Sequence, residues 1–247
     1  MKNIVSIAAA LLIGWGAAAQ PADSVSLRKG GSLNMEWMQP FSGVAVDGPM
    51  RVVLTRIGED EPTKIAYDTR SSLDSRVKAS VDKYGILTLR EKNSREKIDT
   101  TEVRVYYRTL ATLSAAGARV SFTEPVTEPM VDLSVSGGAR VEAELDVRDL
   151  VLNVTGKSEV VLKGQSRYLT LTVSTARIDA SGLHTLSTRV DASHGAQVDV
   201  VADERFEANA ASAKIRFGGK PEIVRAETST FGGEIVEAEP DGEIHIR

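Results

Sequence analysis

The sequence predicts an all-β fold: a parallel β-helix, or solenoid, of about seven coils of about 19 residues, capped by an N-terminal antiparallel β region. Three observations lead to this prediction. An imperfect repeat runs from Leu113 to the C-terminus, apolar and polar residues alternate with period two inside each copy, and small residues cluster between the alternating segments. A unit this short cannot bury an apolar face alone, so successive copies must stack around one shared core.

Two apolar columns define the repeat. The first column is Leu113, Leu133, Leu152, Leu171, Val190, Phe206 and Val224. The second column is Val120, Val141, Val160, Ile178, Val198, Ile215 and Ile235. Members of the second column recur about every 19 residues, which fits stacked strands about 4.8 Å apart with one copy per coil. Corresponding residues of successive copies should therefore form ladders.

Local composition predicts strands and corners within each copy. In Leu171-Thr172-Val173 an outward polar residue stands between two inward apolar residues, which is the pattern of a strand. The clusters Gly137-Gly138-Ala139 and His194-Gly195-Ala196 predict corners, because the backbone bends sharply there and the side chains must be small.

The region between Phe41 and Leu110 differs from the repeats. It contains short alternating segments such as Ile86-Leu87-Thr88-Leu89, and the turn sequence Asp82-Lys83-Tyr84-Gly85 precedes this one. These features predict antiparallel strands. Because the first coil of a solenoid needs a cover, we expect this region to cap it.

The N-terminus predicts export. Lys2 is followed by an apolar stretch that ends in Ala17-Ala18-Ala19, so residues 1–19 have the pattern of a signal peptide and Gln20 follows the expected cleavage site. A membrane-spanning helix is the alternative, but the stretch is short for a span and contains two glycines. We therefore expect an exported protein of a Gram-negative bacterium, periplasmic or on the cell surface, with no transmembrane segment after cleavage.

These patterns divide the chain into five segments. They are the signal peptide (1–19), an N-terminal segment (20–39), the antiparallel cap (40–111), the β-helix repeats (112–236) and a C-terminal tail (237–247). The chain contains no Cys, so a continuous core rather than disulfides must hold this exported protein together. Removal of Lys2 with the signal changes the net charge from −4 to about −5, and this mild acidity argues against a nucleic-acid partner.

Three segments of the sequence resemble a known family. Phe41-Ser42-Gly43-Val44-Ala45-Val46, the hairpin end Gly85-Ile86-Leu87-Thr88-Leu89 and the coil at residues 133–141 are similar to the auto-transporter adhesin, head GIN domain family of exported Bacteroidetes proteins. The resemblance extends over about residues 40–236. Its name points to adhesion, and it carries over no catalytic residues.

The residues directly before the second column are the candidates for ligand binding. They are polar and of mixed sign: Arg119, Arg140, Glu159, Arg177, Gln197, Lys214 and Glu234. At coil spacing, Glu159 lies between Arg140 and Arg177 and can pair with either. Two interpretations stay open: a solvated row of ion pairs worth about 0–1 kcal/mol each, or a strip in which Arg119, Arg140, Arg177 and Lys214 grip acidic glycans.

The sequence predicts no catalytic residue, no cofactor and no metal site. His184, His194 and His245 lie in turn or terminal contexts and share no spacing of metal ligands. The nearest approach to a catalytic pair is Asp179 with Asp199, which stacking would place about 5 Å apart. One stacked pair of this kind is more typical of a solvated face than of a catalytic site.

We therefore expect an exported, non-enzymatic β-helical interaction module that contacts a cell-surface glycan or protein in adhesion. Two alternatives stay open: a polysaccharide-active β-helix enzyme, either a lyase or a hydrolase, and a structural homo-oligomeric scaffold. Clustered carboxylates would favour the enzyme, a flat apolar patch would favour the oligomer, and aromatic platforms would favour sugar binding. The chain contains two Trp, and Trp15 lies in the signal, which weakens the case for sugar stacking.

Overall fold

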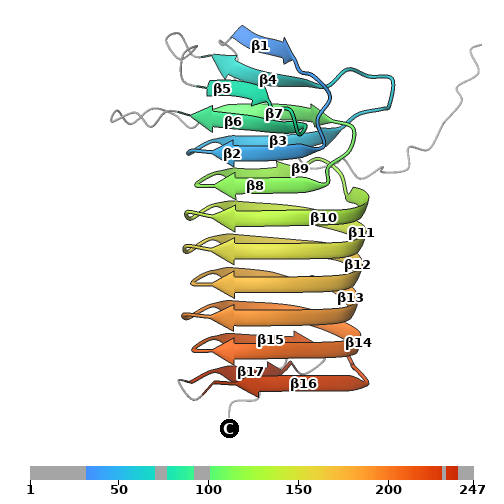
Figure 1. The fold of residues 1–247 in the computed structure, drawn as a ribbon, viewed down its shortest axis with the longest axis vertical. Coiled ribbons are helices and arrows are strands. Elements are labelled where there is room, and N and C mark those ends of the chain that lie inside the picture. Colours follow the sequence, from blue (N-terminus) through green and yellow to red (C-terminus); the bar gives the residue numbers. More distant parts are fainter. Residues whose placement is uncertain (1–31, 70–76, 92–100, 230–231, 239–247) are drawn as a thin grey trace, which may run out of the picture. The chain divides into compact units, whose positions relative to one another are not determined.

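The computed structural model describes residues 32–69, 77–91, 101–229 and 232–238, which form strands and no helix. The chain winds in successive coils around one core, so that a coil adds one strand to each of two facing sheets (Figure 1). The predicted all-β solenoid of about seven coils is confirmed. The predicted signal peptide lies outside the described residues, and within them no helix is present that could cross a membrane.

The strands follow one another along the described residues. They are β1 (Ser32–Trp37), β2 (Gly43–Asp47), β3 (Arg51–Arg56), β4 (Lys64–Thr69), β5 (Val77–Val81), β6 (Ile86–Glu91), β7 (Glu102–Tyr107), β8 (Thr112–Ala116), β9 (Arg119–Phe122), β10 (Val126–Ser136), β11 (Arg140–Thr155), β12 (Glu159–Ser174), β13 (Arg177–Ser193), β14 (Gln197–Ala211), β15 (Lys214–Gly218), β16 (Ile223–Thr228) and β17 (Glu234–Glu237). Strands β10 to β14 are long because each bends from one part of its coil into the next without a break.

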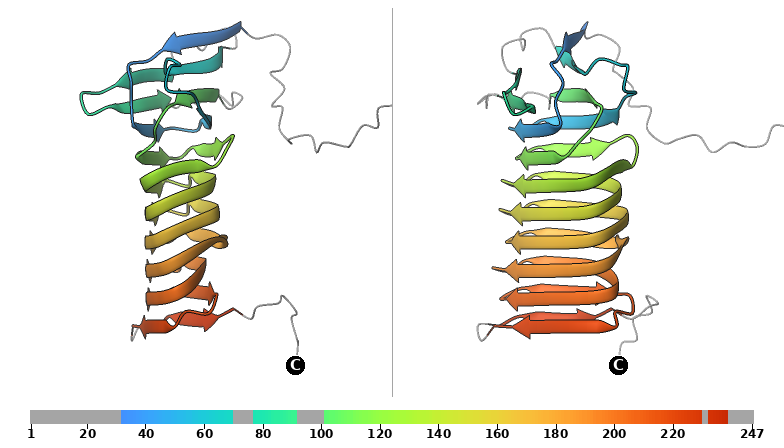
Figure 2. Two further views of the ribbon diagram at one scale, coloured as in Figure 1. Left: turned by 90° about the vertical axis from the view of Figure 1, so that its right-hand side faces the viewer. Right: turned by 45° about the vertical axis from the view of Figure 1, so that its right-hand side comes forward.

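The two sheets correspond to the two apolar columns. The first sheet contains β6, β2, β8, the later halves of β10 to β14, and β16. The second sheet contains β7, β3, β9, the earlier halves of β11 to β14, β15 and β17. These strands are parallel to their neighbours one coil away, and Figure 2 shows the stacked coils from two further sides.

Tight turns join the first sheet to the second, and they use backbone with positive φ. Gly137 (φ 66°) and Gly138 (φ 76°) form the turn before β11, and His194 (φ 54°) and Gly195 (φ 77°) form the turn before β14. Between β12 and β13 a single residue, Thr175 (φ 55°), does the same. Left-handed backbone suits glycine and strains a β-branched residue. Both corner sequences singled out above therefore lie at turns.

The second column stacks as the sequence predicts. Each member pairs with the next, from Val120 with Val141 to Ile215 with Ile235. The members from Val120 to Ile215 are at most 2% exposed, so this column forms a continuous wall of the core.

The first column is correct for its first five members and wrong for its last two. Val190 pairs with Ala208, whereas Phe206 lies two residues earlier, opposite Thr188. Between the two sheets, the register of β14 against β13 shifts between Ala180 and His184 and again between Thr185 and Ser187, and counting apolar residues does not reveal these irregularities. The Phe206 ring stacks on Phe217 of the second sheet with centroids 4.2 Å apart, and it fills the core beside the small Ala208.

The cap contains the predicted antiparallel pairs together with two more coils. β1 pairs with β4, β4 with β7, and β5 with β6, all antiparallel. The other cap strands are parallel: β2 lies between β6 and β8, and β3 lies between β7 and β9. In the stack, the coil of β2 and β3 therefore lies between the coil of β6 and β7 and the coil of β8 and β9, although β2 and β3 come first in the chain. Period-two alternation is the same for both strand directions and does not predict this order.

Candidate functional site

The polar ladder predicted from the sequence is a continuous row along the second sheet. Strand register places its members on successive coils, and two cap residues extend it. From the cap onward the row is Glu102, Arg51, Arg119, Arg140, Glu159, Arg177, Gln197, Lys214 and Glu234. Neighbouring strands lie about 4.8 Å apart, so neighbouring side chains are within reach of each other. We call this row the polar ladder.

Arg140 is held by two carboxylates. Its Nε lies 2.8 Å from Glu142 Oε1, and its Nη1 lies 3.0 Å from Glu159 Oε2. The hydrogen bond with Glu142 and the negative charges of Glu159 and Glu142 raise the pKa of Arg140. Of the two partners that the sequence allows for Glu159, the structure therefore selects Arg140 rather than Arg177.

Arg177 and Lys214 also have partners along the polar ladder. Arg177 donates from Nη2 to Gln197 Oε1 at 2.6 Å, and Lys214 Nζ lies 3.0 Å from Glu234 Oε2. Exposed pairs of this kind contribute about 0–1 kcal/mol each, so they mainly fix where the side chains lie. Over these coils the structure fits the interpretation as a solvated row of polar pairs.

Arg119 and Arg51 differ from the rest of the polar ladder. Both are exposed, and the register places them directly beside each other on β9 and β3. Neither forms an ion pair with any residue that the structure describes. Like charges opposite one another on neighbouring strands destabilise a sheet. Glu102, the neighbour of Arg51 on its other side, instead pairs with Arg104 at 3.9 Å. The two cations of the polar ladder that lack an ion-pair partner among the described residues therefore lie at its cap end.

An aromatic and cationic cluster lies on the outer surface of the cap, on the same side of the sheet as Arg51 and Arg119. Trp37 of β1 pairs with Lys64 of β4, and Lys64 pairs with Tyr106 of β7. Lys64 Nζ lies 5.5 Å from the centroid of the Trp37 ring and 4.8 Å from that of Tyr106, within cation–π range of both. We call these three residues the Trp37 cluster.

Sequence reasoning did not find the Trp37 cluster. Trp37 falls in the segment 20–39, where no strand was predicted, and its neighbours come from β4 and β7 through antiparallel pairings. The available signal was the alternation of large apolar residues at Met35 and Trp37, which has the period of a strand. No spacing rule connects that short strand to its partners.

Asp179 and Asp199 stand side by side, as the enzyme alternative requires. Arg216 on the next coil binds Asp199, with its Nη2 donating to Asp199 Oδ2 at 2.8 Å, and this hydrogen bonding raises the pKa of Arg216. Asp179 accepts a hydrogen bond from Ser181 Oγ at 2.6 Å. Both carboxylates thus bond to neighbours in the sheet itself, an arrangement typical of a surface salt network rather than of a general acid and base.

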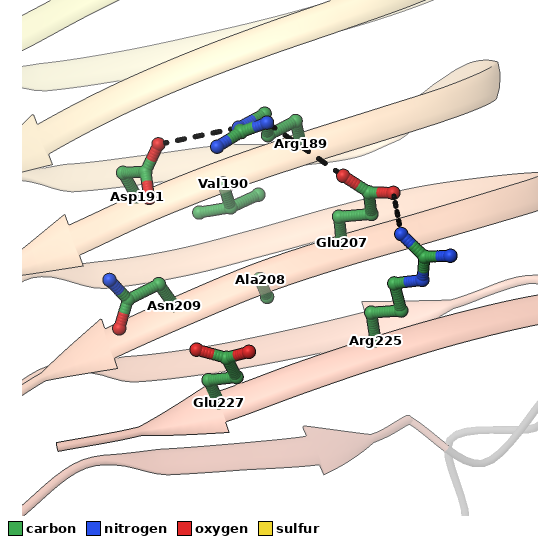
Figure 3. Close-up of a pocket in the computed structure, with 8 residues that line it drawn as sticks. All are labelled: Arg189, Val190, Asp191, Glu207, Ala208, Asn209, Arg225 and Glu227. Atoms are coloured by element: carbon green, nitrogen blue, oxygen red, sulfur yellow. Dashed lines mark ion pairs between the residues drawn. The ribbon is translucent and has the colours of Figure 1, made fainter.

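A hollow of about 250 Å³ lies over the C-terminal part of the first sheet (Figure 3). A chain of ion pairs crosses it: Arg189 Nη1 lies 3.8 Å from Glu207 Oε2, and Glu207 Oε1 lies 3.6 Å from Arg225 Nη1. Asp191 approaches Arg189 at 3.7 Å from the other side. The charged groups of the hollow therefore largely pair with one another. In the described parts of the chain, no group of three or more His, Cys, Asp or Glu is arranged to hold a metal ion.

Comparison with known proteins identifies the family. Residues 40–221 match the family described as "Putative auto-transporter adhesin, head GIN domain". The chain belongs to this family. The resemblance found in three segments of the sequence is thereby confirmed. Trp37 lies before the residues that match the family. A search of curated proteins finds no match to this sequence.

Solved structures share the fold of this head GIN domain. A "putative adhesin" from Bacteroides fragilis has a TM-score of 0.77 at 16% identity, covering 85% of this chain and 97% of its own. A "putative adhesin" from Parabacteroides merdae has a TM-score of 0.64 at 16% identity, covering 86% and 98%. A "putative lipid binding protein" from Parabacteroides distasonis has a TM-score of 0.65 at 14% identity, covering 86% and 98%. At these identities the likeness shows the fold alone.

Proposed function

We propose that this head GIN domain protein is exported and acts without catalysis, as an adhesion module whose outer sheet surfaces contact a glycan or protein of the cell surface. The polar ladder is the observation that carries the proposal. It holds outward side chains in rows with a fixed step of about 4.8 Å between coils, which is a rigid template for an extended partner. Membership of the family described as "Putative auto-transporter adhesin, head GIN domain" supports it.

The side-chain partners of Asp179 and Asp199 favour binding over catalysis. A hydrolase or lyase needs an acid and a base placed to exchange protons with a substrate. Asp199 is engaged by Arg216, and Asp179 accepts from Ser181. Both carboxylates are therefore held by neighbouring side chains of the sheet, and neither is needed for the proposed contact.

Export follows from the predicted signal peptide at residues 1–19. The protein purified from the periplasm or the cell surface should begin at or near Gln20, because the small-residue run before it is the best cleavage site. N-terminal sequencing of the exported protein tests this, and an intact Met1 would contradict it.

The adhesion proposal is tested by binding of the labelled exported chain to whole cells and to arrays of surface polysaccharides and glycoproteins. We expect saturable binding that Asp179→Asn and Asp199→Asn leave unchanged, and no release of reducing or unsaturated ends from any polysaccharide. Products that form with the parent and disappear in either Asp variant would replace adhesion with catalysis. Failure to bind any cell, glycan or glycoprotein would reject adhesion outright.

A further inference from the structure

We propose that the cap end of the second sheet binds acidic polysaccharide, with Trp37 stacking on a sugar ring and with Arg51 and Arg119 pairing with the carboxylate or sulfate groups of the chain. This inference rests on the proposed adhesion function and names its ligand class and its site. It places the contact at the cap end of the polar ladder rather than along its whole length, because Arg51 and Arg119 at that end have no ion-pair partner among the described residues.

The Trp37 ring is placed as a binding platform. It is 64% exposed although it belongs to a strand that is paired with β4 along its whole length. A large aromatic side chain normally buries most of its surface, and amphipathic rings left exposed on a rigid element are typical of binding surfaces. Lys64 stands between Trp37 and Tyr106, which adds a cation beside the rings and helps to hold both of them in place.

The unpaired arginines lie on the same outer surface as the Trp37 cluster. Tyr106 stands opposite Thr55 on β3, and Arg51 lies four residues back along that strand, about 13 Å away on the same face. Arg119 is beside Arg51 on the next coil. One sheet surface thus presents an aromatic platform at one side and two guanidinium groups at the other. A chain of several sugar rings is long enough to reach from the platform to the guanidinium groups.

The charges on this surface select an acidic ligand. Arg51 and Arg119 repel each other at strand spacing, and an anionic group placed between them would relieve that repulsion. Guanidinium groups bind carboxylate and sulfate oxygens with paired hydrogen bonds, so the match is also geometric. A neutral sugar would leave both charges uncompensated.

The rest of the molecule argues against a nucleic acid as the polyanion. Beyond Arg119 each cation of the polar ladder has a partner, and the exported chain carries a net charge of about −5. Nucleic-acid binding requires many phosphate contacts along an extended basic surface. A short basic patch beside an aromatic ring instead fits sugars that carry separated acidic groups.

The first experiment measures binding of the exported chain, residues 20–247, to four polymers at low salt: polygalacturonate, dextran sulfate, neutral dextran and polyglutamate. We expect at least one of the two acidic polysaccharides to bind at least tenfold more tightly than dextran and polyglutamate, with affinity falling as salt is added. Preference for polygalacturonate identifies carboxylate as the recognised group, and preference for dextran sulfate identifies sulfate. Equal binding of polyglutamate, or no binding of either acidic polysaccharide, would overturn the inference.

The second experiment uses matched variants. Trp37→Ala and the double variant Arg51→Gln/Arg119→Gln should each weaken binding at least tenfold. Tyr168→Ala removes another aromatic ring that is 52% exposed, and Arg167→Gln/Lys220→Gln removes two exposed cations from other coils, so both controls should stay within twofold of the parent. Circular dichroism and the melting temperature verify that each variant is folded. Parent-like binding by Trp37→Ala, or an equal loss in the controls, would contradict the site.

The two proposals fail in different ways. If the exported chain adheres to cells or glycoproteins while neither acidic polysaccharide binds it, adhesion stands and the ligand class is wrong. If the Trp37→Ala and double Arg variants lose polysaccharide binding and cell adhesion together, the same site serves both.

Discussion

At the scale of single residues, the inward positions of the coils are buried and mostly apolar, so a charge placed there should destabilise the fold. Val173 on β12 is 1% exposed and pairs with the fully buried Val154 of the preceding coil. Val173→Asp would bury a carboxylate without a partner and should lower the free energy of unfolding by more than about 3 kcal/mol. Thr170 points outward beside Arg189, so Thr170→Asp should change it by less than about 0.5 kcal/mol. Denaturant unfolding measures both, and equal losses would mean that the inward and outward faces of β12 are reversed.

A buried phenol makes stability depend on alkaline pH. Burial raises the pKa of Tyr107 on β7 from its ordinary 10.0 to about 12. The folded state therefore holds the phenol proton more tightly than the unfolded state does. The resulting stabilisation is complete below about pH 10 and is lost as the pH rises from 10 to 12. Over this range the melting temperature of the parent should fall more steeply than that of Tyr107→Phe, and parallel curves for the two proteins would contradict the assignment.

At the scale of the element, the tight turns carry local strain. Thr175 has a φ of 55° between β12 and β13, a conformation that costs a β-branched residue about 1–2 kcal/mol. Thr175→Gly should remove most of this strain and raise the free energy of unfolding by about 0.5–1 kcal/mol after the entropic cost of glycine. The same change at Thr172, an exposed strand position, should lower it by a similar amount. Thermal unfolding of the two variants should thus show opposite signs, and a destabilised Thr175→Gly protein would mean that the threonine side chain stabilises the turn.

Within an element, the sequence predicts some features and not others. Alternation in β12 fixes which residues point inward, because a strand has only two faces. The turn position is encoded less directly, since Gly137, Thr175 and Ser212 all adopt the same left-handed backbone. The predicted register of Phe206 is wrong by two residues because β14 shifts against β13 at two irregularities between the sheets. The second column directly follows the turns, and its register is regular and correctly predicted.

At the scale of the whole molecule, the coils depend on their neighbours for stability. The coils of β11 to β13 have a strand on both sides, whereas β16 pairs with β14 alone among the described strands and is exposed along its whole length. In a stacked repeat each coil is stabilised by its neighbours, so the last described coil should open first. Hydrogen exchange should be faster for the amides of β16 and β17 than for those of β11 to β13, and uniform protection across all coils would show that the solenoid opens only as one unit.

The sequence by itself determined the solenoid, its coil length, its second column and the order of residues in the polar ladder. These features share one property: each contact joins residues a nearly constant distance apart in sequence, so a single spacing predicts all of them. Arg119, Arg140, Arg177 and Lys214 were placed on one line for this reason. Which of these cations are neutralised depends on side-chain contacts that the spacing does not encode.

The tertiary structure alone decided the cap and, with it, the candidate site. In the stack, β2 and β3 separate the coil of β6 and β7 from the rest of the solenoid, although β6 and β7 come later in the chain. Trp37 meets Lys64 and Tyr106 through antiparallel pairings. These contacts span unequal lengths of chain and are selected by how the end of the core is best covered, rather than by any repeat. The positive charge of Arg51 and Arg119 and the aromatic platform of Trp37 therefore come together only in the folded protein.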